Sequence, residues 1–136
     1  METKYNNKAL DKRIKITSLD RLFSYYIRWI REEGKCKRCG RQFIQPTNIL
    51  HCSHFYGRAN RRVRYDPDNC DAMCYHDHQY LSSHPNTYVE WKKEQLGEKK
   101  FEDLNKRANW PHMKKIDLKL VELWLKQELK KHESSI

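Results

Sequence analysis

The sequence lacks any long apolar run, and it also lacks internal repeats and low-complexity tracts. No segment of its 136 residues is apolar enough to span a bilayer, and none has the order of charged, apolar and small residues that marks a signal peptide. These absences argue against a membrane protein and against a secreted one. We therefore expect an intracellular, cytoplasmic protein with no membrane partner.

Acidic residues are also missing from one part of the chain. Residues 34–64 contain eight Lys and Arg side chains and no Asp or Glu, within a protein of formal net charge +10. Arg and Lys clusters bind polyanions by releasing their counterions, and Arg forks suit phosphate oxygens. We predict that this basic stretch contacts DNA, mostly independently of base sequence, through Lys37, Arg38, Arg41, Arg58, Arg61, Arg62 and Arg64.

The composition nevertheless predicts a folded chain. Hydrophobic residues make up 38% and aromatic residues 12%, which is too much for a disordered protein. The length fits a single domain. We expect residues 1–17 to form a basic arm and residues 18–136 to form the domain.

Helical periodicity appears at both ends of this domain. It predicts a helix over residues 18–33, capped by Ser18 and ended by Gly34, and further helices within residues 86–131, separated at Gly97 and Pro111. The first of these further helices starts at Asn86 or Pro85, and a shorter one lies around residues 101–107. The last of these is apolar over more than half of its circumference. That width fits packing against the first helix, and it also leaves room for a homodimer contact.

The five cysteines indicate metal binding. An odd number in an intracellular chain does not suggest a disulfide framework. Cys36 and Cys39 form a C-x-x-C-G knuckle, and Cys74 with Asp77 repeats the spacing with a carboxylate in the last place. We predict a structural zinc site at Cys36, Cys39, Cys74 and Asp77, with Cys70, Cys52 or a histidine as alternatives to Asp77.

A resemblance follows from the order of these motifs. The chain has C-x-x-C, then L-x-C-x-H-F at residues 50–55, an Arg-rich loop, R-x-D-x-x-N-C at residues 64–70, and then Cys74 and His78. This order resembles the HNH (ββα-metal) nucleases, and more narrowly the phage recombination proteins called NinG or Rap. Flanking segments at residues 19–28 and 102–108 extend the likeness over most of residues 18–130.

The resemblance implies an α+β fold. Its centre would be a zinc-stapled ββα-metal core within residues 35–84, in which two antiparallel strands carry the first histidine and a helix carries the last metal ligand. Helices at the N-terminal and C-terminal sides would flank this core. If the protein is encoded by a bacteriophage, it would act in the cytoplasm of the host cell.

The resemblance also implies roles for individual residues. His54 matches the general base that takes a proton from water, and Asn69 matches the residue that orients it. His78 matches a ligand of a catalytic divalent cation, Mg²⁺ or Mn²⁺. The implied activity is metal-dependent endonuclease cleavage of DNA, with branched, single-stranded or duplex substrates in phage recombination.

Two departures from the HNH pattern leave an alternative open. Ser53 stands where many HNH nucleases have an aspartate ligand, and a hydroxyl is a poor substitute. His51 can serve as a ligand only if it reaches the ion, although a regular strand would point it away from His54. A catalytically silent zinc module that binds DNA or a recombination partner is therefore the second hypothesis, and a zinc-stabilised adaptor that binds only protein is a distant third.

Overall fold

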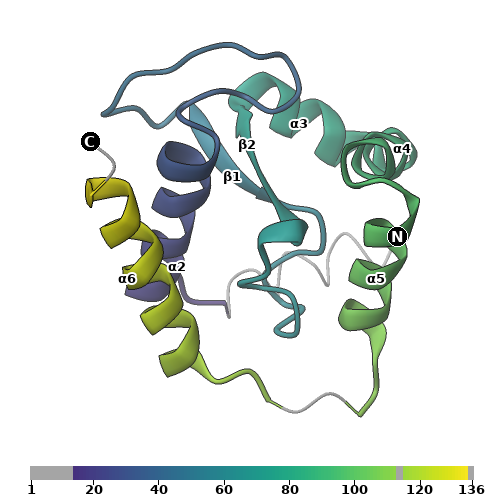
Figure 1. Cartoon of the computed structure of the whole chain (residues 1–136). Coiled ribbons are helices and arrows are strands. Elements are labelled where there is room, and N and C mark those ends of the chain that lie inside the picture. The colour runs from purple at the N-terminus through teal and green to yellow at the C-terminus, as the bar shows by residue number, and fades with distance from the viewer. Residues whose placement is uncertain (1–13, 113–114, 135–136) are drawn as a thin grey trace.

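The computed structural model describes residues 14–112 and 115–134, so most of the predicted basic arm lies outside the described residues. The described chain is an α+β protein with a two-stranded antiparallel sheet and five α-helices, which confirms the predicted class (Figure 1). In chain order the elements are α2 (Ser18–Tyr25), the π-helical segment η1 (Tyr26–Arg31), β1 (Leu50–His54), the 3-10 turn η2 (Pro67–Asn69), β2 (Cys70–Cys74), α3 (Tyr75–Ser83), α4 (Pro85–Leu96), α5 (Glu98–Asn109) and α6 (Leu118–Ser134). None of the helices within these residues is long and apolar enough to cross a membrane.

The first helix starts one residue away from the predicted cap. Thr17, not Ser18, is the N-cap: its hydroxyl accepts a hydrogen bond from the backbone N–H of Asp20, and the Asp20 carboxylate accepts one from the backbone N–H of Thr17. This reciprocal capping box satisfies two N–H groups that the first turn leaves unpaired, whereas Ser18 at the cap would offer only one such bond. The helix ends before Gly34 as predicted. Gly34 has φ of +79°, and a Cβ there would lie 2.8 Å from the carbonyl oxygen of Phe43.

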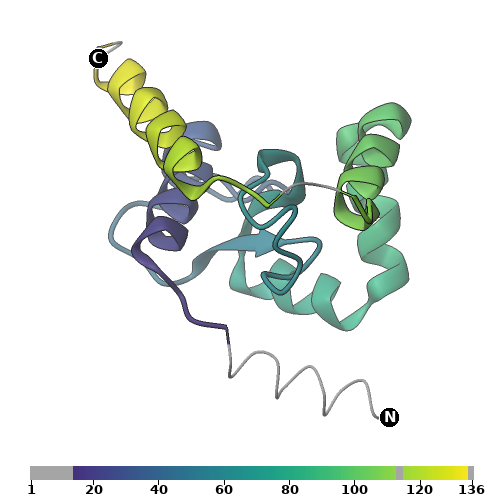
Figure 2. The same cartoon turned by 90° about the horizontal axis from the view of Figure 1, so that it is seen from below.

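The sheet divides the molecule into two halves. The two strands pair residue by residue, from Leu50 with Cys74 to His54 with Cys70, without a bulge. Successive side chains therefore alternate between the two faces of the sheet. Figures 1 and 2 show α2 and α6 on one side of the sheet and α3, α4 and α5 on the other. Cys52 and Cys70 pack toward the first side, with Phe23, Ile27 and Leu125.

The C-terminal helices follow the predicted order with different bounds. Pro85, one of the two starts that the sequence offers beside Asn86, takes the first position of α4, where its missing N–H costs nothing. Gly97 separates α4 from α5, which is longer at both ends than the predicted helix over residues 101–107. Two ion pairs then bind α5 to the turn before β2, because Arg107 lies 2.7 Å from Asp66 and 3.2 Å from Asp68.

The last helix closes the core against the first, as one of the two sequence interpretations expects. Leu125 is fully buried between α6 and the α2–η1 helix. Leu118, Leu120 and Leu123 are exposed on α6. The apolar face of α6 is therefore wider than this contact uses.

The N-cap assignment predicts a difference between two neighbouring substitutions. Thr17→Ala removes the capping hydroxyl and should lower the free energy of unfolding by about 1 kcal/mol. Ser18→Ala, at the first helical position, should change it by a few tenths of that amount. Urea denaturation of the metal-loaded variants measures both free energies of unfolding. An equal decrease in the two variants would contradict the assignment of Thr17 as the N-cap.

Candidate metal centres

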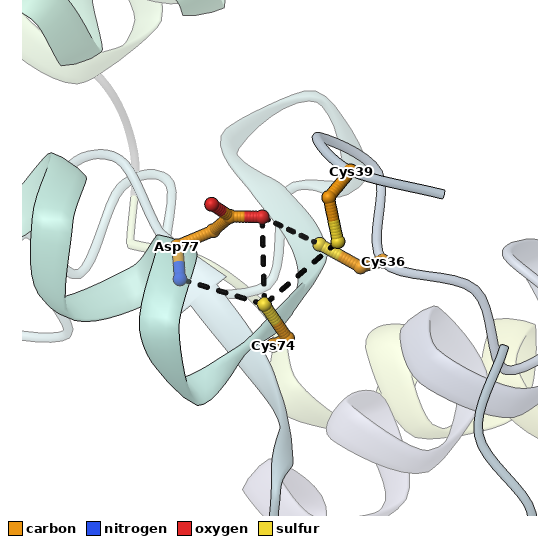
Figure 3. A group of neighbouring side chains, drawn as sticks. All are labelled: Cys36, Cys39, Cys74 and Asp77. Atoms are coloured by element: carbon orange, nitrogen blue, oxygen red, sulfur yellow. Dashed lines mark hydrogen bonds between the residues drawn. The ribbon is translucent and has the colours of Figure 1, made fainter. Parts of the chain in front are cut away.

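Four predicted ligands converge where the knuckle loop meets the start of α3. The ligand atoms of Cys36, Cys39, Cys74 and Asp77 all lie within 4.8 Å of one another (Figure 3). Cys36 and Cys39 come from a tight loop that turns at Gly40, whose φ of +77° favours glycine. Cys74 ends β2 and is the N-cap of α3, and Asp77 lies in the first turn of that helix.

The spacing of this cluster fits a tetrahedral ion. Zn–S bonds of 2.3 Å and a Zn–O bond of 2.0 Å imply about 3.8 Å between two sulfurs and about 3.5 Å between sulfur and oxygen. The Cys39 and Cys74 sulfurs lie 4.0 Å apart, and Asp77 Oδ2 lies 3.3 Å from Cys36 Sγ and 3.4 Å from Cys74 Sγ. The cluster can therefore hold a metal ion, and its donor set is compatible with structural zinc.

Asp77 is held as a carboxylate. Burial tends to raise its pKa, but hydrogen bonds from Cys36 and Arg38 outweigh that effect and keep the pKa at about 2. Arg38 Nη1 lies 2.7 Å from Asp77 Oδ1, which leaves Oδ2 facing the sulfurs. Arg38 thus orients the carboxylate in the way that outer-shell groups commonly orient metal ligands.

A second meeting of ligands lies between β1 and α3. The Nδ1 atoms of His51 and His78 are 2.9 Å apart. The Nε2 atom of His51 lies 2.9 Å from the carbonyl oxygen of Asn48, which can only accept a hydrogen bond. In a neutral His51 the proton is therefore on Nε2, and the lone pair on Nδ1 faces His78.

A small separation of the two rings would let this pair bind one metal ion. Two nitrogens bound at about 2.1 Å to one ion are about 3.0–3.4 Å apart when their bonds meet at 90° to 109°. A ligating histidine usually donates its other N–H to a carbonyl group, as His51 does to Asn48. The pair opens into a surface pocket of about 320 Å³, so two imidazoles and solvent can supply the ligands of a divalent cation.

His54 occupies the other face of the strand. Its side chain is largely buried near Phe23, with ring centroids 6.2 Å apart. Burial first, and the nearby charge of Arg58 second, lower the pKa of His54 to about 4. Its Nε2–H donates to the carbonyl oxygen of Arg64 at 3.1 Å, so the neutral ring carries its lone pair on Nδ1. His54 is thus a neutral proton acceptor at physiological pH.

Asn69 acts on the loop that holds His54. Its Oδ1 accepts from the backbone N–H of Tyr56 at 2.8 Å, and its Nδ2 donates to the carbonyls of Tyr56 and Val63. These bonds close the loop between β1 and β2, whose Arg64 carbonyl receives the His54 ring. The amide is fully used and buried, so Asn69 positions His54 through the backbone and has no free group for an ion.

The sequence predicts one centre formed by His54, Asn69 and His78, and this centre stays a prediction. Two sets of three or more metal-type ligands occur within the described residues, and neither joins His54 to His78. The alternation of a regular strand is the reason, because it sends His51 toward α3 and His54 toward α2. Burial is the largest cause that lowers the pKa of His54 and of His78, and the charge of Arg58 lowers both pKa values further.

Two buried polar pairs beside this site escaped sequence analysis. The Ser53 hydroxyl lies 2.6 Å from the Tyr88 hydroxyl, and the buried Lys92 ammonium lies 2.7 Å from Asp71. Both pairs connect the α3 side of the sheet to α4. Ser53 is therefore satisfied by Tyr88 and is no ligand. In the sequence, the spacing of apolar residues indicated the helix α4. That spacing does not reveal which polar residues of the helix face the sheet.

The basic stretch is partly committed to the fold. Arg64 makes two hydrogen bonds to the buried Asp20 carboxylate, at 2.9 and 2.6 Å, so this predicted DNA contact instead ties the loop to α2. Arg38 supports Asp77, as described above. The side chains of Lys37, Arg38, Arg41, Arg61 and Arg62 are exposed. Arg58 is half-buried, and its Nε forms an ion pair with Asp20 Oδ1 at 3.8 Å.

Comparisons with known proteins do not identify a family for this chain. No protein-family model matches the sequence, and neither curated proteins nor solved structures give a match.

Removing the ion should unfold the centre of the chain. The loop from Cys36 to Ile49 contains no regular strand or helix, so a metal ion bound at the cluster would supply much of its order. Chelation should lower the melting temperature and broaden the transition in calorimetry, and adding zinc back should restore both. An unchanged transition after elemental analysis has verified metal loss would contradict this role.

His54 should not titrate in the physiological range. With a pKa of about 4, its ring stays neutral between pH 5.5 and 8, whereas an ordinary histidine changes charge near pH 6.5. Unfolding returns the ordinary pKa, so the unfolded chain binds a proton that the folded chain does not, and this group's contribution to stability is lost as pH falls from 6.5 toward 4. Histidine ring NMR shifts check this: those of His54 should be flat across the range, and a midpoint near 6.5 would refute its neutral burial.

Proposed function

We propose that this protein is a metal-dependent endonuclease of the HNH type that cleaves phosphodiester bonds in DNA. The pairing of His51 and His78 carries the proposal, because two imidazole nitrogens 2.9 Å apart at a surface pocket can supply two of the six ligands of a divalent cation. The charge of Arg58 acts on both His78 and the neutral His54, and phosphodiester hydrolysis can use a proton acceptor and a cation of these kinds. The motif order that resembles HNH nucleases supports the same activity.

The residues divide the chemistry among themselves. A Mg²⁺ or Mn²⁺ ion held by His51 and His78 would need water and substrate phosphate to supply the oxygen ligands that these ions prefer, and it would stabilise the charge that develops on the phosphate oxygens. His54, the last residue of β1, accepts a proton on Nδ1 from the attacking water while its Nε2–H stays on the Arg64 carbonyl. Arg58, whose charge reaches His54 and His78 alike, neutralises the scissile phosphate between them.

We also propose that the cluster at Cys36, Cys39, Cys74 and Asp77 holds zinc. Thiolates favour this ion over Mg²⁺ or Ca²⁺, and four protein ligands leave no open position for catalysis. The zinc would fix the knuckle loop to β2 and α3. Together β1, β2 and α3 would then form the ββα-metal core of the HNH type.

The DNA backbone would lie along the exposed part of the basic stretch. Lys37, Arg41, Arg61 and Arg62 supply positive side chains to phosphates. Arg64 and Arg38 are left out because Asp20 and Asp77 already pair with them. Contacts of this kind are independent of base sequence. Branched or single-stranded DNA formed in phage recombination is the substrate that the resemblance favours.

One observation favours a second function. The Ser53 hydroxyl is buried against Tyr88 in place of the aspartate ligand of many HNH nucleases. A site with two protein ligands binds a divalent cation more weakly than one with three. The second candidate is therefore a silent module that binds DNA through the same basic residues without cutting it.

Cleavage assays distinguish the two functions. The protein should cut duplex, single-stranded or branched DNA with Mg²⁺ or Mn²⁺ and not with chelator, and His54→Ala should slow cutting by about 10²-fold to 10⁴-fold. His112→Ala is the matched control, because His112 is an exposed histidine outside the cluster. Binding that persists while every DNA remains intact, in the wild-type protein and the variants, would select the silent module.

Salt dependence tests the assigned DNA surface. The logarithm of the binding constant should fall steeply with the logarithm of salt concentration, with a slope that drops by about 1 for each phosphate contact removed. Arg41→Gln and Arg61→Gln should each reduce the slope in this way. Lys99→Gln, a 90% exposed side chain on α5, is the control and should not. A flat response in the wild-type protein would contradict the phosphate contacts.

A further inference from the structure

Three ligand-type side chains meet on the face of the sheet that packs against α2. Cys52 and His54 are two residues apart on β1 and therefore share a face, and Cys70 is the register partner of His54. Their ligand atoms all lie within 4.8 Å of one another. Cys52 and Cys70 are the two cysteines that the first cluster leaves unused.

The two cysteines of this trio lie in apolar surroundings, whereas His54 is half-buried and also lines a pocket of about 590 Å³. Cys70 is fully buried and Cys52 is 9% exposed, and both pack with Phe23, Ile27 and Leu125. Buried cysteines often act only as small apolar side chains. Here two of them converge on an imidazole whose Nε2–H is fixed by the Arg64 carbonyl, so that the lone pair is on the remaining nitrogen.

This ligand set selects a soft ion. Two thiolates and one imidazole suit Zn²⁺ and do not suit Mg²⁺ or Mn²⁺, which prefer oxygen ligands. The carbonyl on the other ring nitrogen is the outer-shell partner that zinc-bound histidines usually have. The site is also separate from the first cluster, because Cys70 and Cys74 are four residues apart on one strand, or about 13 Å.

We propose that Cys52, His54 and Cys70 form a second, inhibitory zinc site. Binding one Zn²⁺ displaces a proton from each thiol to solvent and places the ion on the lone pair of His54. His54 can then no longer accept a proton from water. The inhibitory effect rests on the proposed endonuclease function, whereas the metal site does not.

Cobalt spectroscopy tests the site without reference to activity. Protein that carries one zinc per chain is titrated with Co²⁺, and thiolate-to-cobalt charge-transfer absorption is recorded while a chromogenic indicator detects any zinc released. The band should saturate at one equivalent with no zinc release. His51 and His78 contribute nothing to it because they carry no sulfur.

Variants identify the ligands. Cys70→Ala and Cys52→Ala should abolish the band, whereas Ala72→Ser, a buried change on the same strand, should keep it. Circular dichroism checks that each variant is folded. If a cysteine variant does not fold, the titration of the wild-type protein still tests the site. The absence of the charge-transfer band, or release of zinc in an amount equal to the cobalt bound, would overturn the site.

Cleavage assays test the inhibition separately. In Mg²⁺, a second equivalent of Zn²⁺ should reduce wild-type cutting to the level of His54→Ala. The same addition should leave the cutting rate of Cys70→Ala unchanged from its rate before the second equivalent. Equal inhibition of wild type and Cys70→Ala would overturn the regulatory role. If no protein cuts DNA under any condition, the endonuclease proposal fails while the cobalt result still decides the metal site.

Discussion

The junction of β2 with α3 is the constraint on which the rest of the structure depends. Cys74 ends the strand, caps the helix and belongs to the four-ligand cluster, and Asp77 joins the cluster one turn later. The same helix carries His78 to His51. An ion in the cluster therefore fixes the knuckle loop and, through α3, the distance between the two histidines. The few apolar side chains of the knuckle loop could not do this by packing alone.

The sheet separates two chemical environments. On the α3 side, His51 and His78 meet at a surface pocket, and the buried pairs Ser53–Tyr88 and Asp71–Lys92 connect this side to α4. On the α2 side, His54 lies among sulfur and aromatic groups. The alternation of side chains along β1 from His51 to His54 produces this separation. The charge of Arg58 lowers the pKa of one histidine on each side, His54 and His78. The proposed activity depends on the phosphate of the substrate bridging them at the end of β1.

Local patterns predicted most of the fold and the first metal cluster. Apolar periodicity, Gly34 and Gly97 marked the helices, and the repeated C-x-x spacing marked the four ligands, because these features act within a few residues of one another. The choice of Asp77 over Cys52 or Cys70 needed the register of the strands, which brings those two thiols to His54 instead. The Asp20–Arg64 and Asp71–Lys92 pairs join residues 44 and 21 positions apart, and no local spacing reveals such contacts.

The most direct measurement is anomalous diffraction from crystals of the zinc-loaded protein soaked in Mn²⁺. The account predicts a manganese peak within bonding distance of His51 Nδ1 and His78 Nδ1, next to the Arg58 side chain. Crystals in which saturating Mn²⁺ gives no peak there, while the two imidazoles remain hydrogen-bonded to each other, would contradict a catalytic cation at this pair and with it the endonuclease proposal.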